Sequence, residues 1–132
     1  PANATHTKPL LADAGPRTLQ GAGTRRGRLW GGCLEVLEML KGTPWWPPAP
    51  ASRDVVLLIE GSEEAPPPAL YRRVLRSWAA AGALESVAAV LVGYPAGYDA
   101  SRRAALDAEL RRTLAEECGL GDVPVLVDCA FG

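Results

Sequence analysis

The sequence is poor in the residues from which metal centres and disulfide frameworks are built. It contains a single histidine, His6, in a polar N-terminal segment, and three cysteines that form no CxxC pair. A zinc site therefore lacks ligands at workable spacing, and we expect neither a metal nor another cofactor. The cysteines, Cys33, Cys118 and Cys129, are odd in number and widely spaced in apolar surroundings. This pattern indicates buried reduced thiols and favours a cytoplasmic setting.

Long apolar runs and an excess of one charge are absent as well. No apolar stretch approaches the roughly 20 residues that a bilayer requires, and the N-terminus has neither a basic start nor an apolar signal core. The 14 basic and 15 acidic side chains leave a net charge of -1, and no basic stripe follows any expected element. Membrane insertion and nucleic-acid binding are therefore disfavoured. A chain of 132 residues that is 48% hydrophobic is typical of one soluble globular domain.

Several catalytic and nucleotide-binding motifs are also missing. The glycine-rich segment 21–27 does not have the spacing G-x-G-x-x-G and follows a polar segment, and no G-x-x-x-x-G-K-[ST] occurs. No serine stands in a G-x-S-x-G elbow or near a histidine. The chain by itself therefore lacks a pair of nucleophile and base. The serines considered are Ser52, Ser62, Ser77, Ser86 and Ser101.

After residue 20, apolar spacing predicts alternating strands and helices, which is typical of an α/β layer with parallel pairing and right-handed crossovers. Residues 1–20 are predicted to be an irregular lead-in or linker. The unbroken apolar run 55–59 predicts a strand buried on both faces. Four prolines between residues 43 and 50 predict an extended loop. The expected strands cover residues 28–30, 55–60, 87–92 and 123–128, and the expected helices cover about 33–41, 66–81 and 101–118.

A carboxylate stands at the end of the strand predicted over residues 55–60. The carboxyl ends of strands are where α/β enzymes keep catalytic groups, so Glu60 is a catalytic candidate. The same pattern is also typical of a solvated or helix-capping carboxylate. Glu63 and Glu64 have a simple explanation of their own, since acidic residues favour the N-terminus of a following helix. Context must decide between these interpretations.

Three ordered blocks supply that context: Gly27-Arg28-Leu29-Trp30-Gly31-Gly32-Cys33-Leu34, Gly42-Thr43-Pro44, and Leu57-Leu58-Ile59-Glu60 with Glu64. Together they resemble the C-terminal domain of the LD-carboxypeptidase family of serine peptidases, over residues 21–132. The segments Cys33-Leu34-Glu35-Val36-Leu37-Glu38 and Ser62-Glu63-Glu64 are most similar to the branch of microcin-C immunity (self-resistance) peptidases. The resemblance implies a swivelling β/β/α-type domain with a small, mostly parallel sheet and flanking helices.

The resemblance also implies a catalytic role for Glu60. Enzymes of the family use a Ser-Glu-His triad, in which the Ser comes from an N-terminal domain and the Glu and His from the C-terminal domain. Glu60 matches the triad Glu, which holds the imidazole in the tautomer that accepts the serine proton. The His would follow Phe131-Gly132. Without that His and without the N-terminal nucleophile domain, the isolated chain is expected to be inactive.

For the parent protein, the resemblance implies amide hydrolysis by acyl transfer. The substrate would be an LD-peptide bond of a muropeptide or the amide of a microcin-C-like aminoacyl nucleotide, and the branch motifs favour the second. Gly32, Cys33 and Glu64 are the substrate-side candidates. Cys33 stands where many relatives carry Asn, and a thiol is a weaker hydrogen-bonding partner. The expected partners are the N-terminal domain, a small substrate and a second copy in a homodimer.

Two other interpretations stay open. Trp45 and Trp46 lie in the proline-rich loop and could make the chain a non-catalytic module that binds a ligand or a protein, although such aromatics often pack on their own domain. A dimerisation domain would instead show a large apolar surface near residues 30–50.

Overall fold

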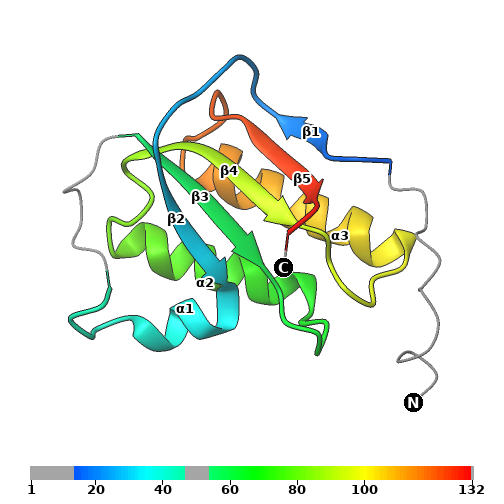
Figure 1. The fold of residues 1–132 in the computed structure, drawn as a ribbon, viewed down its shortest axis with the longest axis horizontal. Helices are drawn as coiled ribbons and strands as arrows, with labels where there is room; N and C mark the ends of the chain where they lie inside the picture. Colours follow the sequence, from blue (N-terminus) through cyan, green and yellow to red (C-terminus); the bar gives the residue numbers. More distant parts are fainter. Residues whose placement is uncertain (1–13, 47–53, 132) are drawn as a thin grey trace, which may run out of the picture.

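The computed structural model describes residues 14–46 and 54–131, and Figure 1 shows how their elements follow one another. Strands and helices alternate after residue 27, as the apolar spacing predicts. The elements are β1 (Arg17–Gln20), β2 (Arg28–Cys33), α1 (Leu34–Leu40), β3 (Val55–Glu60), α2 (Pro68–Ala80), β4 (Val87–Gly93), α3 (Ala100–Arg111), the π-helical segment η2 (Arg112–Glu117) and β5 (Val125–Cys129).

The five strands form one mixed sheet in the order β1-β5-β4-β3-β2. Strands β2, β3, β4 and β5 pair in parallel, which confirms the predicted α/β class and its parallel pairing. Strand β1 is antiparallel to β5 at one edge. The expectation of irregular structure over residues 1–20 is therefore wrong for Arg17–Gln20, while residues 1–13 lie outside the described part. Four residues with polar ends carry too short a pattern to identify an edge strand.

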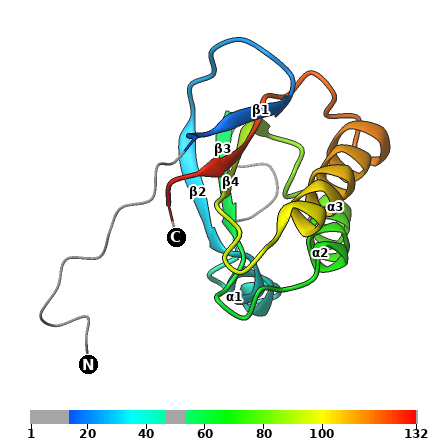
Figure 2. The same ribbon diagram turned by 90° about the vertical axis from the view of Figure 1, so that its right-hand side faces the viewer.

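The helices lie on one side of the sheet, as Figure 2 shows. Along β3, Val55, Leu57 and Ile59 are buried under the helices, whereas the alternating residues Val56, Leu58 and Glu60 are only half-buried. The prediction that β3 is buried on both faces is therefore wrong. An unbroken apolar run does not distinguish a strand covered on two faces from one covered on a single face, because that depends on what packs against it.

The core between the sheet and α2 is centred on Trp78, which has no exposed surface. Its indole N–H donates to Glu38 at 2.7 Å, so the buried donor is satisfied. The Trp30 and Trp46 rings pack against it, with centroids 5.5 and 5.6 Å from the Trp78 ring. Trp46 thus packs on its own domain, which was one of the two roles considered for the tryptophans of this loop.

The C-terminal half of the chain contributes further buried residues to the same core. Leu106 and Leu110 of α3 and Leu114 of η2 are buried, as the predicted apolar stripe requires. Asp99 caps α3 by accepting a hydrogen bond from the Arg102 backbone N–H at 2.8 Å. Within the described ranges, no helix combines the length and the apolar character needed to cross a bilayer.

Candidate active site

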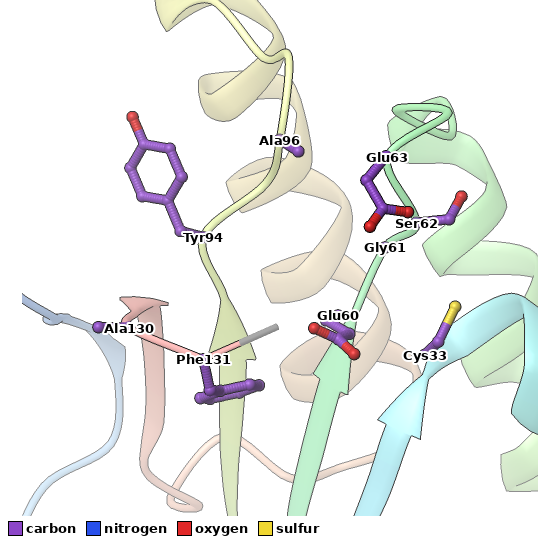
Figure 3. Close-up of a pocket in the computed structure, with 9 residues that line it drawn as sticks. All are labelled: Cys33, Glu60, Gly61, Ser62, Glu63, Tyr94, Ala96, Ala130 and Phe131. Atoms are coloured by element: carbon purple, nitrogen blue, oxygen red, sulfur yellow. The ribbon is translucent and has the colours of Figure 1, made fainter. Parts of the chain in front are cut away.

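A cavity of about 550 Å³ opens beyond the carboxyl ends of the parallel strands. Ligands of α/β proteins bind at this edge of the sheet, because loops from neighbouring strands converge there. Figure 3 shows that its walls come from the ends of β2, β3 and β4 and from the turn after β5. The lining residues are Cys33, Glu60, Gly61, Ser62, Glu63, Tyr94, Ala96, Ala130 and Phe131.

Glu60 is the last residue of β3, and its side chain belongs to the sheet face that the helices leave open. Its Cα pairs with that of Cys33 on β2, so both predicted candidates line the same cavity. On the other side, a Cβ placed on Gly93 of β4 would lie 3.1 Å from the Glu60 Cβ. Glycine at this position therefore leaves the room that the Glu60 side chain occupies.

The chain returns to the same cavity after β5. Asp128 has a φ of 58°, in the left-handed region, and the chain bends there at the end of the strand. The Phe131 N–H then donates to the Cys129 carbonyl at 2.9 Å, which closes a tight turn. Ala130 and Phe131 consequently line the cavity together with Glu60 (Figure 3).

A second carboxylate, Glu35 of α1, lies behind the cavity and holds its wall. It accepts a hydrogen bond from the Ser62 hydroxyl at 2.8 Å and a weaker one from the Cys33 thiol at 3.4 Å. Burial alone would raise the pKa of Glu35, but the hydrogen bonds from Ser62 and Cys33 outweigh it and hold the pKa below its ordinary value. Glu35 therefore stays ionised while half-buried.

The two acidic residues after Ser62 have different positions. Both are exposed, but only Glu63 lines the cavity, with its carboxylate pointing toward Glu60 in Figure 3. Neither residue lies at the N-terminus of a helix, because α2 begins at Pro68 and has no acidic residue in its first turn. The interpretation of this pair through the helix dipole is thus wrong.

The far side of the loop between β3 and α2 is anchored by Tyr98, which precedes α3, and by Arg102 of α3. The Tyr98 hydroxyl donates to the Pro66 carbonyl, and Arg102 donates to the Ala65 carbonyl at 2.7 Å. The Arg102 guanidinium also lies over the Tyr98 ring, 4.4 Å from its centroid. The loop that follows Glu60 is therefore held at both ends, by Glu35 on one side and by Tyr98 and Arg102 on the other.

A smaller hollow of about 230 Å³ adjoins the cavity on the open sheet face, and Glu60 and Phe131 line both. The predicted substrate-side residue Gly32 lines this hollow with Leu29, Trp30, Gly31 and Leu58. Sequence reasoning did not identify Glu35, Tyr94 or Phe131 as residues of the site. The signals available were the position of Tyr94 directly after an apolar strand and the position of Phe131 just before the expected triad His.

Apolar side chains outside the cavity are exposed on and after α1. Val36 is 53%, Met39 76% and Trp45 80% exposed. This surface lies in the region where a dimerisation domain would place it, and residues 47–50 of that region lie outside the described part. Among residues 14–46 and 54–131, no group of histidine, cysteine or acidic side chains could hold a metal ion.

The comparisons with known proteins agree with this architecture. No curated protein sequence matches the chain. Among solved structures, an MccF-like protein from Streptococcus pneumoniae in complex with AMP has a TM-score of 0.73 at 21% identity, over 92% of this chain and 37% of that one. MccF in complex with glutamyl sulfamoyl guanosine has a TM-score of 0.65 at 22% identity, over 94% and 34%.

Muramoyltetrapeptide carboxypeptidase from Oxalobacter formigenes has a TM-score of 0.58 at 26% identity, over 80% of this chain and 35% of that one. The chain thus spans little more than a third of the length of these solved relatives. The family model that describes the LD-carboxypeptidase C-terminal domain matches residues 26–132. With its mostly parallel sheet and its cavity at the strand ends, the chain belongs to the LD-carboxypeptidase C-terminal domain family.

Proposed function

We propose that the chain is the C-terminal domain of a serine carboxypeptidase or amidase, in which Glu60 is the orienting acid of a Ser-Glu-His triad. One observation carries this proposal: Glu60 at the end of β3 and the turn after β5 line one cavity. In the family that the sequence resembles, the triad histidine follows such a turn. A histidine placed after this turn in the parent protein would therefore come close to Glu60.

In that arrangement Glu60 would accept a hydrogen bond from one imidazole nitrogen. The other nitrogen would then take the proton of the serine hydroxyl, which attacks the amide carbon, and would return it to the leaving amine. The serine would come from an N-terminal domain on the open side of the cavity. The half-exposed residues Val56 and Leu58 on the open sheet face offer apolar surface for that domain to cover.

Two substrate classes are compatible with this site. The name of the Oxalobacter relative supports an LD-peptide bond of a muropeptide. The AMP and glutamyl sulfamoyl guanosine bound to the MccF-type structures support the amide of an aminoacyl nucleotide. Cys33 and Ser62-Glu63-Glu64 occupy the positions whose sequence resembles the microcin-C immunity branch, so we place the parent protein with the second class.

The test is hydrolysis of an LD-muropeptide and of an aminoacyl sulfamoyl adenylate by the full-length parent and its Glu60→Ala and Glu60→Gln variants. Loss of the orienting carboxylate should lower kcat by about four orders of magnitude with folding intact, since the imidazole then takes the wrong tautomer. Glu85→Ala, at an exposed position away from the cavity, is the matched control and should retain full activity. Unchanged turnover in Glu60→Ala would refute the role of Glu60, and the preferred substrate would identify the branch.

A second function, self-association, is favoured by the exposed apolar side chains of Val36, Met39 and Trp45. We propose that they contact a second copy of the chain in a homodimer. The alternative is a binding module built on Trp45 and Trp46. The Trp46 ring is already engaged by packing against Trp30 and Trp78. Only Trp45 of that pair is free to contact a ligand or a partner.

A further inference from the structure

We propose that Glu35 is a positioning residue that fixes the turn following Glu60 and thereby sets the orientation of the catalytic carboxylate. This inference rests on the proposed function, since it concerns the same reaction. Glu35 does not line the cavity. It acts through Ser62, two residues after Glu60, and through Cys33, whose Cα pairs with that of Glu60 in the sheet.

The contacts of Glu35 join the two strand ends that carry the site. Its Oε1 atom accepts from the Ser62 hydroxyl at 2.8 Å, and the Ser62 backbone N–H lies 3.4 Å from both carboxylate oxygens. Its Oε2 atom accepts from the Cys33 thiol at 3.4 Å. Cys33 ends β2, and Ser62 belongs to the loop after β3. A single ionised side chain thus fixes both ends relative to each other, and charge-assisted hydrogen bonds of this kind are the stronger ones.

The geometry of the loop links this clamp to the cavity. Figure 3 shows the side chains of Ser62 and Glu63 pointing in different directions, with the Glu63 carboxylate directed toward Glu60. The hydrogen bond from Ser62 to Glu35 thus holds the residue directly before Glu63. Gly61, between Glu60 and Ser62, is closely packed, since an added Cβ would lie 2.4 Å from the Tyr71 hydroxyl and 2.9 Å from Pro66 Cγ. The clamp thus acts over a short and tightly packed segment.

The loop after β3 has different contacts at its two ends. On the far side, the Pro66 carbonyl accepts from the Tyr98 hydroxyl and the Ala65 carbonyl accepts from Arg102 of α3. Near Glu60, the side-chain contacts of Ser62 are those with Glu35. Loss of Glu35 would therefore release the part of the loop next to the catalytic residue.

The experiment uses the full-length parent with Glu35→Ala, Glu35→Gln, Ser62→Ala and the double variant Glu35→Ala/Ser62→Ala. Amide hydrogen exchange of residues 61–65 is measured beside kcat and KM on the substrate that the wild type hydrolyses. Glu117→Ala is the matched control, because Glu117 is also a carboxylate with side-chain partners, but these are Arg76 and Arg112 on the helical side. Near-ultraviolet circular dichroism checks that each variant is folded.

Glu35→Ala should increase exchange at Ser62 and Glu63 by about tenfold or more. It should lower kcat by about 10- to 100-fold with KM little changed, because a displacement on the scale of 1 Å misplaces a catalytic group. Ser62→Ala should have a similar effect, and the double variant should lose no more than the single variants, since all three remove one interaction. Glu35→Gln keeps an acceptor for the Ser62 hydroxyl and should recover much of the activity.

Faster exchange without a change in kcat would overturn the proposal, because Glu35 would then be structural only. Unchanged exchange in Glu35→Ala would overturn it as well, and so would losses that multiply in the double variant. If the wild type hydrolyses neither substrate, the proposed function fails. The exchange data would then still decide whether Glu35 holds the turn.

Discussion

Gly93 at the end of β4 lies between two parts of the candidate site, and replacing it with alanine tests their packing. A Cβ on Gly93 would lie 2.9 Å from the Phe131 carbonyl oxygen, 3.1 Å from the Glu60 Cβ and 3.2 Å from the Phe131 ring. The nearest of these atoms is backbone and cannot rotate away. The turn after β5 or the end of β3 must therefore move in Gly93→Ala.

The expected loss of stability follows from two opposing effects. Inserting a methyl group into a packed site typically costs about 1–3 kcal/mol. Replacing glycine also restricts the unfolded chain, which offsets about 0.4–1 kcal/mol of that cost. We therefore expect Gly93→Ala to lower the free energy of unfolding by about 1–2 kcal/mol. In the parent enzyme, the displaced Glu60 should lower kcat by up to about 100-fold.

Urea unfolding of the 132-residue chain, followed by tryptophan fluorescence, measures the first effect. Gly121→Ala is the matched control, because its added Cβ would make only an ordinary contact, 3.9 Å from the Ala115 Cβ. This control should be as stable as the wild type, or more stable by up to about 1 kcal/mol. Equal stability of the two variants would refute the packing argument. A destabilised Gly93→Ala enzyme with full activity would refute the link to Glu60.

Two further predictions concern the surface. Trp45→Ser should shift the proposed homodimer toward monomer in light scattering. Leu29→Ser should not, although it also removes a largely exposed apolar side chain, from β2. A monomeric wild type would contradict the proposal. Hydrogen bonds from Arg76 lower the pKa of Glu117 from 4.5 to about 2, and Arg112 adds to this, so Arg76→Gln should raise that pKa in an NMR titration. Because the pKa of Glu117 is lowered in the folded state, the stability gained from this pair is present above about pH 4.5 and is lost as the pH falls toward 2. An unchanged Glu117 pKa in Arg76→Gln would exclude Arg76 as the cause of the lowered pKa.

Local patterns were sufficient to predict most elements of the fold. Strand β3 begins at Val55 and ends at Glu60 as predicted, because its apolar run is bounded by polar residues on both sides. The start of α2 follows from its prolines, which suit the first helical turn. Strand β1 escaped prediction, because Arg17–Gln20 become a strand only by pairing with β5, at the other end of the chain. That the helices cover one face of the sheet, and not both, also depended on tertiary packing.

The candidate site was likewise predictable in part from local patterns and in part decided by the tertiary structure. The sequence by itself determined that a carboxylate, Glu60, ends a buried strand, because the strand pattern and the residue that follows it are local features. Only the tertiary structure decided that Cys33, Glu63 and Phe131 meet at Glu60, and that Glu35 holds the loop beside it. The physical reason is that parallel strands bring their carboxyl ends to one edge, whereas strand order and register decide which side chains meet there. Order and register are set by packing of the whole core, which no single segment of the sequence encodes.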